Sequence, residues 1–299
     1  MSESAAPSLT IGFIGLGRMG SPMARLLIDG GHRVLGFDLA PEALTHLAEA
    51  GGTPVHSAGE AAAADVVVLM LPDSTVVTAV LRDHDVVAAL AADSIVIDMS
   101  SSEPMRTREL AGELAERGIH LVDAPVSGGV RGAETGKLTI MVGGEAGIVA
   151  RVMPVLELLG RPVRAGDVGA GHAVKALNNL MSATHLWVTS EAMIAGQKFG
   201  LDPEVMLSVF NGSSGRSGST ENKWPNFVLP GGYDSGFGLR LMLKDMLIAT
   251  ALARAVGVEP ALGDEAVQLW SRAADDLEPT ADHTEVARWI GSSAHPSGH

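Results

Sequence analysis

A glycine-rich turn near the start of the chain, Gly15-Leu-Gly17-Arg-Met-Gly20, constrains the fold more than any other feature. It follows a short apolar run, Leu9–Gly15, and precedes residues with helical spacing. A strand, a glycine turn and a helix in this order are typical of a site for a dinucleotide, whose pyrophosphate lies at the helix N-terminus. Gly15 would permit the tight turn, Gly17 would let the backbone approach the pyrophosphate, and Gly20 would let the helix pack on the strand.

An acidic residue at the end of the next apolar segment indicates which dinucleotide the chain binds. Val34–Phe37 is typical of a second strand, and Asp38 follows it directly. A carboxylate in this place accepts hydrogen bonds from the ribose hydroxyls of NAD and repels the 2′-phosphate of NADP. The sequence therefore predicts NAD as the cofactor, with NADP as the less favoured alternative. The competing interpretation is that Asp38 only caps a helix that begins at Pro41.

Strands and helices continue to alternate through the first half of the chain. Further apolar runs typical of buried strands are Val66–Leu71, Ser94–Asp98, Ile119–Asp123 and Leu138–Val142. This alternation predicts an α/β fold with a Rossmann-type doubly wound, largely parallel sheet. Ligands of such sheets bind beyond the carboxyl ends of the strands, where Leu71-Pro72, Ser101 and Ser127-Gly128-Gly129 fall. The alternative for each is an ordinary connecting loop.

A long segment with helical apolar spacing, Ala165–Gln197, opens the second half. Its apolar residues recur at threes, fours and sevens, which predicts one buried stripe made of Val174, Leu177, Met181 and Val188. Lys175, Asn178 and Asn179 are three and four positions apart, so their side chains can meet beside that stripe. Without further context, a structural helix with one solvated lysine is the alternative.

After Gly200 the pattern stays helical to the end. We therefore expect a dinucleotide-binding domain at residues 1–166 and an all-helical substrate and oligomerisation domain at residues 167–299. Asn211–Thr220 is rich in glycine and serine and contains a lone cation, Arg216, that could bind an anion; the alternative is a flexible linker. Lys244-Asp245 interrupts the apolar face of a helix expected at Leu239–Val256, and a surface ion pair is its alternative interpretation.

Composition excludes several classes of function. The formal net charge of −14 argues against nucleic acid as a partner. The chain has no cysteine, so thiolate metal sites are excluded, and His295 and His299 lack a nearby third ligand. We therefore predict no metal site. No apolar run reaches the length of a membrane span, and Met1–Ser8 does not resemble a signal peptide, so a cytoplasmic protein without membrane contact is expected.

In this order the motifs resemble those of the β-hydroxyacid dehydrogenase family, of which 3-hydroxyisobutyrate dehydrogenase is the namesake member. The resemblance runs from about Leu9 to Arg288. Ile11–Ala24 is similar to the family's cofactor fingerprint, and Asp123–Gly129 to its loop for the substrate carboxylate. Gly171–Asn179 is similar to its catalytic helix, and Lys244-Asp245 to the part that carries its lysine near the nicotinamide.

The resemblance implies roles for these residues. Lys175 matches the catalytic lysine, the acid/base at the substrate hydroxyl, and Asn179 would hold the substrate oxygen in register, a role Asn178 could share. Ser127, Gly128 and Gly129 would bind the substrate carboxylate. The cofactor would contact Gly15, Leu16, Gly17, Arg18, Met19, Gly20, Asp38, Leu71, Pro72, Ser101 and Lys244. A lysine that accepts a proton near neutral pH needs a lowered pKa, which desolvation or Lys244 could supply.

The substrate is a small β-hydroxyacid or semialdehyde in this interpretation. Ser213–Ser217 is similar to a serine, glycine and arginine loop of the family, which suggests that Arg216 meets a polar or anionic group of the substrate. The next residues, Gly218–Lys223, depart from the namesake enzyme, where an aromatic residue is expected. Alternatives are an NADPH-dependent semialdehyde reductase, an imine reductase, or a protein that senses NAD without turnover. Long apolar helices favour a homodimer or homotetramer.

Overall fold

The computed structural model describes residues 8–292, which excludes Met1–Pro7 and the tail with His295 and His299. The expectations about a signal peptide and about those two histidines therefore lie outside the described residues. The chain separates into two compact units, and the boundary between them falls between Lys175 and Ala176. The division predicted at residues 166 and 167 remains a prediction. Each unit is described by itself.

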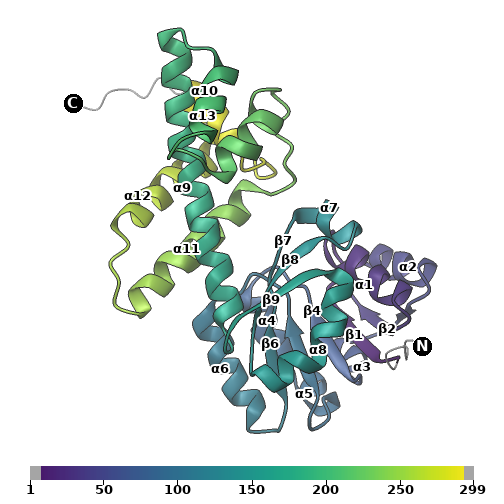
Figure 1. Ribbon diagram of the computed structural model, residues 1–299. Coiled ribbons are helices and arrows are strands. Elements are labelled where there is room, and N and C mark those ends of the chain that lie inside the picture. The colour runs from purple at the N-terminus through teal and green to yellow at the C-terminus, as the bar shows by residue number, and fades with distance from the viewer. Residues whose placement is uncertain (1–7, 293–299) are drawn as a thin grey trace, which may run out of the picture. The chain divides into compact units, whose positions relative to one another are not determined.

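Unit 1 contains one sheet (Figure 1). Its strands are β1 (Thr10–Ile14), β2 (Arg33–Phe37), β3 (Thr53–Pro54), β4 (Val66–Leu69), β5 (Ile95–Asp98), β6 (His120–Asp123), β7 (Val126–Ser127), β8 (Leu138–Gly143) and β9 (Gly160–Gly166). The order is β3-β2-β1-β4-β5-β6-β8-β7, with β9 paired to β8. Strands β1 to β6 are parallel, whereas β8 runs antiparallel to β6 and β7. The predicted Rossmann-type, largely parallel sheet is confirmed.

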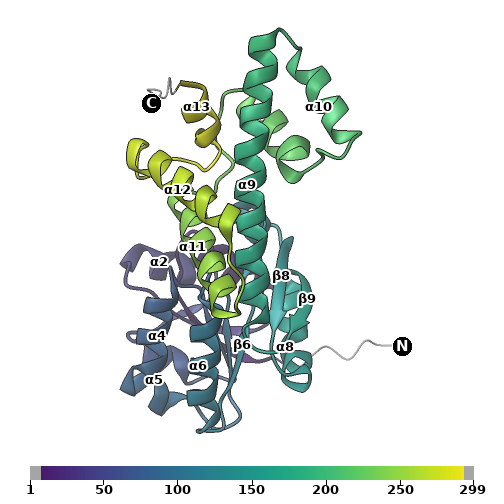
Figure 2. The same ribbon diagram turned by 90° about the vertical axis from the view of Figure 1, so that its left-hand side faces the viewer.

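Helices cover both faces of this sheet because the strands are apolar on both sides. The helices are α1 (Gly20–Asp29), α2 (Pro41–Glu49), α3 (Ala58–Ala62), α4 (Ser74–Arg82), α5 (His84–Ala89), α6 (Pro104–Ala115), α7 (Gly129–Glu134) and α8 (Ala146–Leu159). In β4, Val66 and Val68 join the core under α1 and α8, whereas Val67 and Leu69 join the core under α4 and α6. Figure 2 shows α4, α5 and α6 gathered beside one another.

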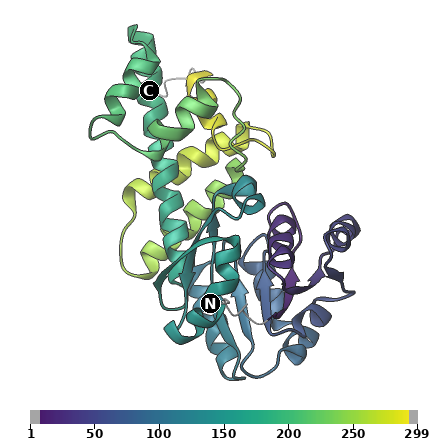
Figure 3. The same ribbon diagram turned by 45° about the vertical axis from the view of Figure 1, so that its right-hand side comes forward.

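Unit 2 is helical, which confirms the predicted fold class of the second half. It contains α10 (Pro203–Asn211), η1 (Ser219–Val228), α11 (Leu239–Ala255), α12 (Ala261–Asp276), α13 (Glu285–Ser292) and most of α9 (Ala170–Phe199). Helices α11 and α12 pack side by side (Figure 3). The core contains four tryptophans, Trp187, Trp224, Trp270 and Trp289. The ring of Trp187 lies 6.3 Å from that of Trp270 and 5.8 Å from that of Trp289.

The helix α9 differs from its prediction in two ways. It begins at Ala170 rather than Ala165, because residues up to Gly166 form β9. The predicted stripe was also wrong, since Val174, Leu177, Met181 and Val188 are 41% to 60% exposed. The buried side of α9 instead mixes small, polar, aromatic and large aliphatic residues, namely His172, Lys175, Ala176, Asn179, Ala183, Leu186, Trp187, Thr189, Ser190 and Met193. Periodicity therefore located a real apolar stripe on this helix but assigned it to the wrong side.

A helix of unusual geometry begins at the end of the glycine-serine loop. Residues Ser219–Val228 form a π-helix with Pro225 inside it. Segments of this kind occur frequently at functional sites.

Candidate active site

The glycine turn has the geometry that a bound pyrophosphate requires. Gly15 has φ +97°, a conformation in which a side chain would be strained. A Cβ atom on Gly20 would overlap the carbonyl oxygen of Gly15, so α1 can pack against the turn only with glycine there. Gly17 is open by contrast, with no atom of the described residues within 4 Å of a Cβ placed on it. The turn thus leaves room for a ligand at the N-terminus of α1.

Asp38 lies beside this turn, at the carboxyl end of β2. Its Oδ2 accepts a hydrogen bond of 2.7 Å from the backbone N–H of Leu16, and its Oδ1 accepts one of 2.8 Å from Ala40. The carboxylate therefore fixes the glycine turn relative to β2. From the sequence we predicted Asp38 as a ribose ligand but did not anticipate this structural role.

Lys175 is buried and lies against the loop predicted to bind the substrate carboxylate. Its Nζ donates a hydrogen bond of 2.8 Å to the carbonyl oxygen of Val126, the residue before Ser127. Gly128 and Gly129 follow with φ values of +128° and +60°, which ordinary side chains rarely adopt. Three parts of the prediction, Lys175, Ser127 and the two glycines, are thus brought together within unit 1.

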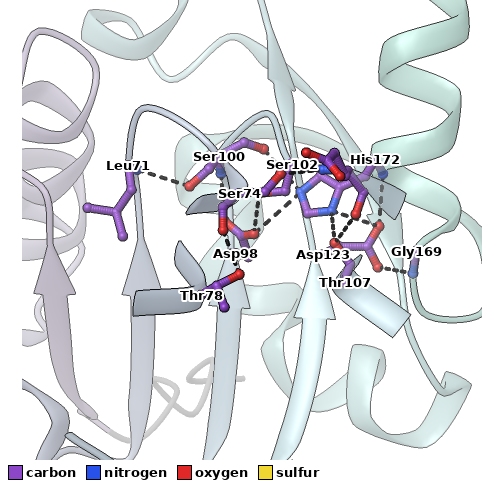
Figure 4. A network of polar contacts seen from close by, with 11 residues as sticks. Leu71, Ser74, Thr78, Asp98, Ser100, Ser102, Thr107, Asp123, Gly169 and His172 are labelled. Atoms are coloured by element: carbon purple, nitrogen blue, oxygen red, sulfur yellow. Dashed lines mark hydrogen bonds and ion pairs between the residues drawn. The ribbon is translucent and has the colours of Figure 1, made fainter. Parts of the chain in front are cut away.

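A buried polar network holds the start of α9 in place (Figure 4). At its centre is His172, three positions before Lys175, with no exposed side-chain surface. The Nδ1 of His172 lies 2.9 Å from Thr107 Oγ1, and its Nε2 lies 3.1 Å from the carbonyl oxygen of Ser100. The carboxylates of Asp98 and Asp123, both buried, lie 3.7 Å and 3.8 Å from the ring nitrogens.

The same network includes hydrogen bonds at the strand ends that carry two other predicted site residues, Leu71 and Ser101. Ser100 Oγ accepts a hydrogen bond of 2.9 Å from the N–H of Leu71, and Ser100 precedes Ser101. Asp123 accepts hydrogen bonds from the N–H groups of Gly169 (2.7 Å) and His172 (2.8 Å). Because a carboxylate is favourable at a helix N-terminus, Asp123 stabilises the first turn of α9. The motif Gly171–Asn179 contains His172 but did not indicate a role for it, because the partners of His172 lie far away along the chain.

Within unit 2, Asn179 is held by a carboxylate of α11. Asn179 Nδ2 donates a hydrogen bond of 2.6 Å to Asp245 Oδ2, and Lys244 Nζ lies 3.4 Å from Asp245 Oδ1. Asn178 Nδ2 in turn donates to Asn179 Oδ1 at 3.2 Å. Asp245 is buried, so the Lys244-Asp245 pair is not an ordinary surface ion pair. The structure thus joins both asparagines and Lys244 in one polar cluster.

Two cations lie on the segment that follows α10, and they differ in environment. Arg216 is exposed, and its Nε donates a hydrogen bond of 2.7 Å to Glu221. Lys223, on η1, is partly buried, and its Nζ donates a hydrogen bond of 2.7 Å to Ser182 Oγ. Burial lowers the pKa of Lys223 to about 8. From the sequence we selected Arg216 and assigned no role to Lys223, because Ser182 lies far away along the chain.

Among residues 8–292, no group of three or more histidine, aspartate or glutamate side chains is placed to hold a metal ion. In the same part of the chain, no helix is both long enough and apolar enough to cross a membrane.

Comparison with known proteins places the chain in a family. A family model for the NAD binding domain of 6-phosphogluconate dehydrogenase matches residues 10–169. A second, for the NAD-binding region of NADP-dependent 3-hydroxyisobutyrate dehydrogenase, matches residues 169–290. The 3-hydroxyisobutyrate dehydrogenase of Pseudomonas aeruginosa is 43% identical over 87% of this chain and 91% of its own length. The 2-(hydroxymethyl)glutarate dehydrogenase of Eubacterium barkeri is 40% identical over 81% of each.

Solved structures agree with these relatives. The 3-hydroxyisobutyrate dehydrogenase of Mycobacterium tuberculosis with L-serine has a TM-score of 0.89 and 34% identity, covering 95% of this chain and 99% of its own. An imine reductase from Myxococcus stipitatus shares the fold alone, with 17% identity, a TM-score of 0.66 and coverage of 95% and 100%. The chain therefore belongs to the β-hydroxyacid dehydrogenase family, typified by 3-hydroxyisobutyrate dehydrogenase, and is an NAD(P)-binding oxidoreductase.

Proposed function

We propose that the protein oxidises a small β-hydroxyacid with NAD, or reduces the corresponding semialdehyde, using Lys175 as the acid/base. The hydrogen bond between Lys175 Nζ and the carbonyl oxygen of Val126 carries this proposal. It holds the lysine beside Ser127, Gly128 and Gly129, which are suited to bind a carboxylate through a hydroxyl and backbone N–H groups. A β-hydroxyacid has its carboxylate and its hydroxyl a short distance apart, which matches this arrangement.

Oxidation requires a proton to leave the substrate hydroxyl while a hydride leaves the carbon atom that carries this hydroxyl. The nicotinamide supplies the hydride chemistry when the cofactor is bound. Lys175 would accept the hydroxyl proton in oxidation and return it in reduction. Asn179, held by Asp245, would keep the substrate oxygen in line with Lys175, and Asn178 would support Asn179.

The cofactor would be held by the glycine turn and by the neighbouring strand ends. The open space at Gly17 and the close packing at Gly15 and Gly20 fit a dinucleotide. Leu16, Arg18 and Met19 would contact it from the turn, and Asp38 would meet the ribose. Leu71, Pro72, Ser101 and Lys244 would line the nicotinamide part of the site. We further propose a dinucleotide domain at residues 1–166, a helical domain at residues 167–299 and a cytoplasmic location.

A panel of β-hydroxyacids, assayed with NAD and NADP by the absorbance of the reduced cofactor, tests this function. We expect turnover of 3-hydroxyisobutyrate or a close analogue, with NAD preferred. Inactivity throughout the panel, with NAD binding intact, would contradict the proposal and favour a sensor of NAD. A clear preference for an imine substrate would instead favour the imine reductases, which share this fold.

The preference for NAD should depend on the charge of Asp38. In the isosteric variant Asp38→Asn, we expect the ratio of kcat/KM for NAD over NADP to fall about 10-fold or more, because the 2′-phosphate is no longer repelled. Asp65→Asn is a matched control, since Asp65 also accepts a backbone hydrogen bond, from Thr10, but lies away from the turn on the exposed surface. An unchanged ratio in Asp38→Asn would show that another group selects the cofactor, as the NADP-dependent family model would suggest.

The exposed stripe of α9 supports assembly with a second copy of the chain. Leu177, Met181 and Val188 lie on it, and Phe199 extends it to the helix end with 85% exposure. Monomeric proteins rarely expose contiguous apolar surface of this kind, and a self-complementary stripe suits a two-fold dimer. We propose a homodimer, or a homotetramer built from such dimers, that covers this stripe.

Light scattering during size-exclusion chromatography checks the assembly. We expect a dimer or tetramer for the native chain and a shift towards monomer for Met181→Glu with Val188→Glu. Leu39→Glu is the control, because Leu39 is 90% exposed outside the stripe. A monomeric native chain, or a double variant with unchanged mass, would rule out this interface.

A further inference from the structure

Lys223 is a partly buried cation whose hydrogen-bond partner is a neutral hydroxyl. An ammonium group can donate three hydrogen bonds, and the contact that the structure shows for Lys223 Nζ is the one to Ser182 Oγ, at 2.7 Å. Burial lowers the pKa of Lys223 to about 8, so the group is still a cation at pH 7. Holding a partly buried cation against a neutral hydroxyl costs free energy unless an anion joins it.

The neighbouring carboxylate of Asp282 is not placed to form an ion pair with Lys223. Asp282 interacts with Lys223 electrostatically, but within residues 8–292 no carboxylate lies within the 4.0 Å of an ion pair with Lys223. Asp282 is already occupied: it accepts hydrogen bonds from Ser235 Oγ, from the N–H groups of Gly236 and Phe237, and from Thr284. Burial would raise the pKa of Asp282, but hydrogen bonds from His283 and Thr284 outweigh it and lower that pKa. The Asp282 carboxylate therefore serves as the hydrogen-bond acceptor for the residues around it rather than as a partner of Lys223.

The position of Ser182 on α9 places Lys223 near Asn179. Ser182 follows Asn179 by three positions on α9, so the two side chains are neighbours on one face of the helix. They are separated by about 5 Å along the helix axis. Asn179 belongs to the cluster with Asp245 and Lys244 that is proposed to hold the substrate oxygen. A substrate bound at Asn179 therefore needs only a short arm to reach the ammonium group of Lys223.

We propose that Lys223 and Ser182 bind a second acidic group of the substrate, at the end of an arm attached to carbon 2 of the β-hydroxyacid. This inference rests on the proposed function and names its substrate class: β-hydroxyacids with two anionic groups. The anion would accept hydrogen bonds from Lys223 Nζ and from the Ser182 hydroxyl, forming the ion pair that Asp282 does not provide. Arg216 is the poorer candidate for this anion, because it is exposed and paired with Glu221.

Three substrates that share the same reacting end test this proposal. 3-Hydroxyisobutyrate has a methyl arm, 2-(hydroxymethyl)pentanoate has a neutral propyl arm, and 2-(hydroxymethyl)glutarate has an arm that ends in a carboxylate. At pH 7 we expect kcat/KM for the glutarate to exceed that for the pentanoate at least 10-fold. In Lys223→Met, whose side chain has similar length without charge, kcat/KM for the glutarate should fall about 10- to 100-fold. The values for the two monoacids should change less than 3-fold.

Further variants separate a binding role from a structural one. Ser182→Ala should lower kcat/KM for the glutarate alone, by a smaller factor, and Lys223→Arg should restore part of the loss. Lys198→Ala, which removes an exposed cation of α9, should leave the ranking of the substrates unchanged. Ser182→Ala also replaces Lys223→Met as the decisive test if the latter does not fold, as judged by circular dichroism.

The possible outcomes are distinguishable from failure of the proposed function. If no β-hydroxyacid is turned over, the proposed function itself fails. If the monoacids are turned over but the glutarate has no advantage over the pentanoate, only the second anion site is overturned. An equal loss for all three substrates in Lys223→Met and Ser182→Ala would likewise overturn it, because it would show that Lys223 merely ties η1 to α9.

Discussion

Replacing Lys175 with alanine is expected to lower kcat for a β-hydroxyacid about 10²- to 10⁴-fold, the usual contribution of a positioned acid/base. The affinity for NAD should stay within about 3-fold of the native value, because the glycine turn and Asp38 lie on other elements of unit 1. Lys175→Arg should be nearly as inactive, since a guanidinium keeps the charge but does not release its proton. The measurements are NADH formation and a fluorescence titration of NADH binding.

Lys137→Ala serves as the control for this experiment, because Lys137 is an exposed lysine of the same unit. It should retain native kcat and native cofactor affinity. If Lys175→Ala kept more than a tenth of native turnover, the acid/base role of Lys175 would be refuted. If it lost NADH binding as well, the effect would be on the structure of the site rather than on proton transfer.

Replacing His172 with alanine is expected to have the largest effect on stability. The variant would leave the Ser100 carbonyl without its partner in a buried region, at about 1–3 kcal/mol, whereas the Thr107 hydroxyl would keep the Glu103 carbonyl as a partner. We therefore expect the free energy of unfolding to fall by about 1–3 kcal/mol, measured by chemical denaturation. The carboxylates of Asp98 and Asp123 would also lose the ring that lies against both of them.

His46→Ala is the matched control, because His46 is exposed on α2. This substitution should change the free energy of unfolding by less than about 0.5 kcal/mol. The decrease for His172→Gln should lie between those for His172→Ala and His46→Ala, because the glutamine amide can still donate to the Ser100 carbonyl. Equal unfolding curves for His172→Ala and His46→Ala would mean that the network does not hold the start of α9.

The dinucleotide half could be predicted because its signals are local. Gly15 and Gly20 are required by a turn and a packing contact within a few residues, and each apolar run forms a strand by itself. The alternation of these runs with helices indicates a parallel sheet, because parallel strands need a crossover connection, which is usually a helix. The structure confirmed this part of the fold with shifts of only a few residues at the ends of elements.

The exposed stripe of α9 shows what periodicity leaves open. Val174, Leu177, Met181 and Val188 do form a stripe, but a helix with two usable faces does not reveal which one faces the core of its own chain. Here the buried side carries small residues such as Ala176 and Ala183, whose hydrophobic signal is weaker than that of the exposed stripe. In the sequence, an apolar helix face that binds a second copy of the chain therefore has the same pattern as a face buried in the core.

Sequence analysis missed His172 and Lys223 for a different reason. His172 is defined by Ser100 and Thr107, which lie 72 and 65 positions away, and Lys223 is defined by Ser182, 41 positions away. Pairings at such separations follow from the fold and leave no local pattern. By contrast, Lys175 and Asn179 could be selected because they stand together in one short motif.

The central claim is that hydride passes from the hydroxyl-bearing carbon of a β-hydroxyacid to NAD. The most direct measurement follows deuterium from 3-hydroxyisobutyrate labelled at carbon 3 into the cofactor by nuclear magnetic resonance. The account predicts one deuterium at C4 of the nicotinamide for each NADH formed, and a strong decrease of this transfer in Lys175→Ala. Reduced cofactor without deuterium, or no reduction with any β-hydroxyacid, would contradict it.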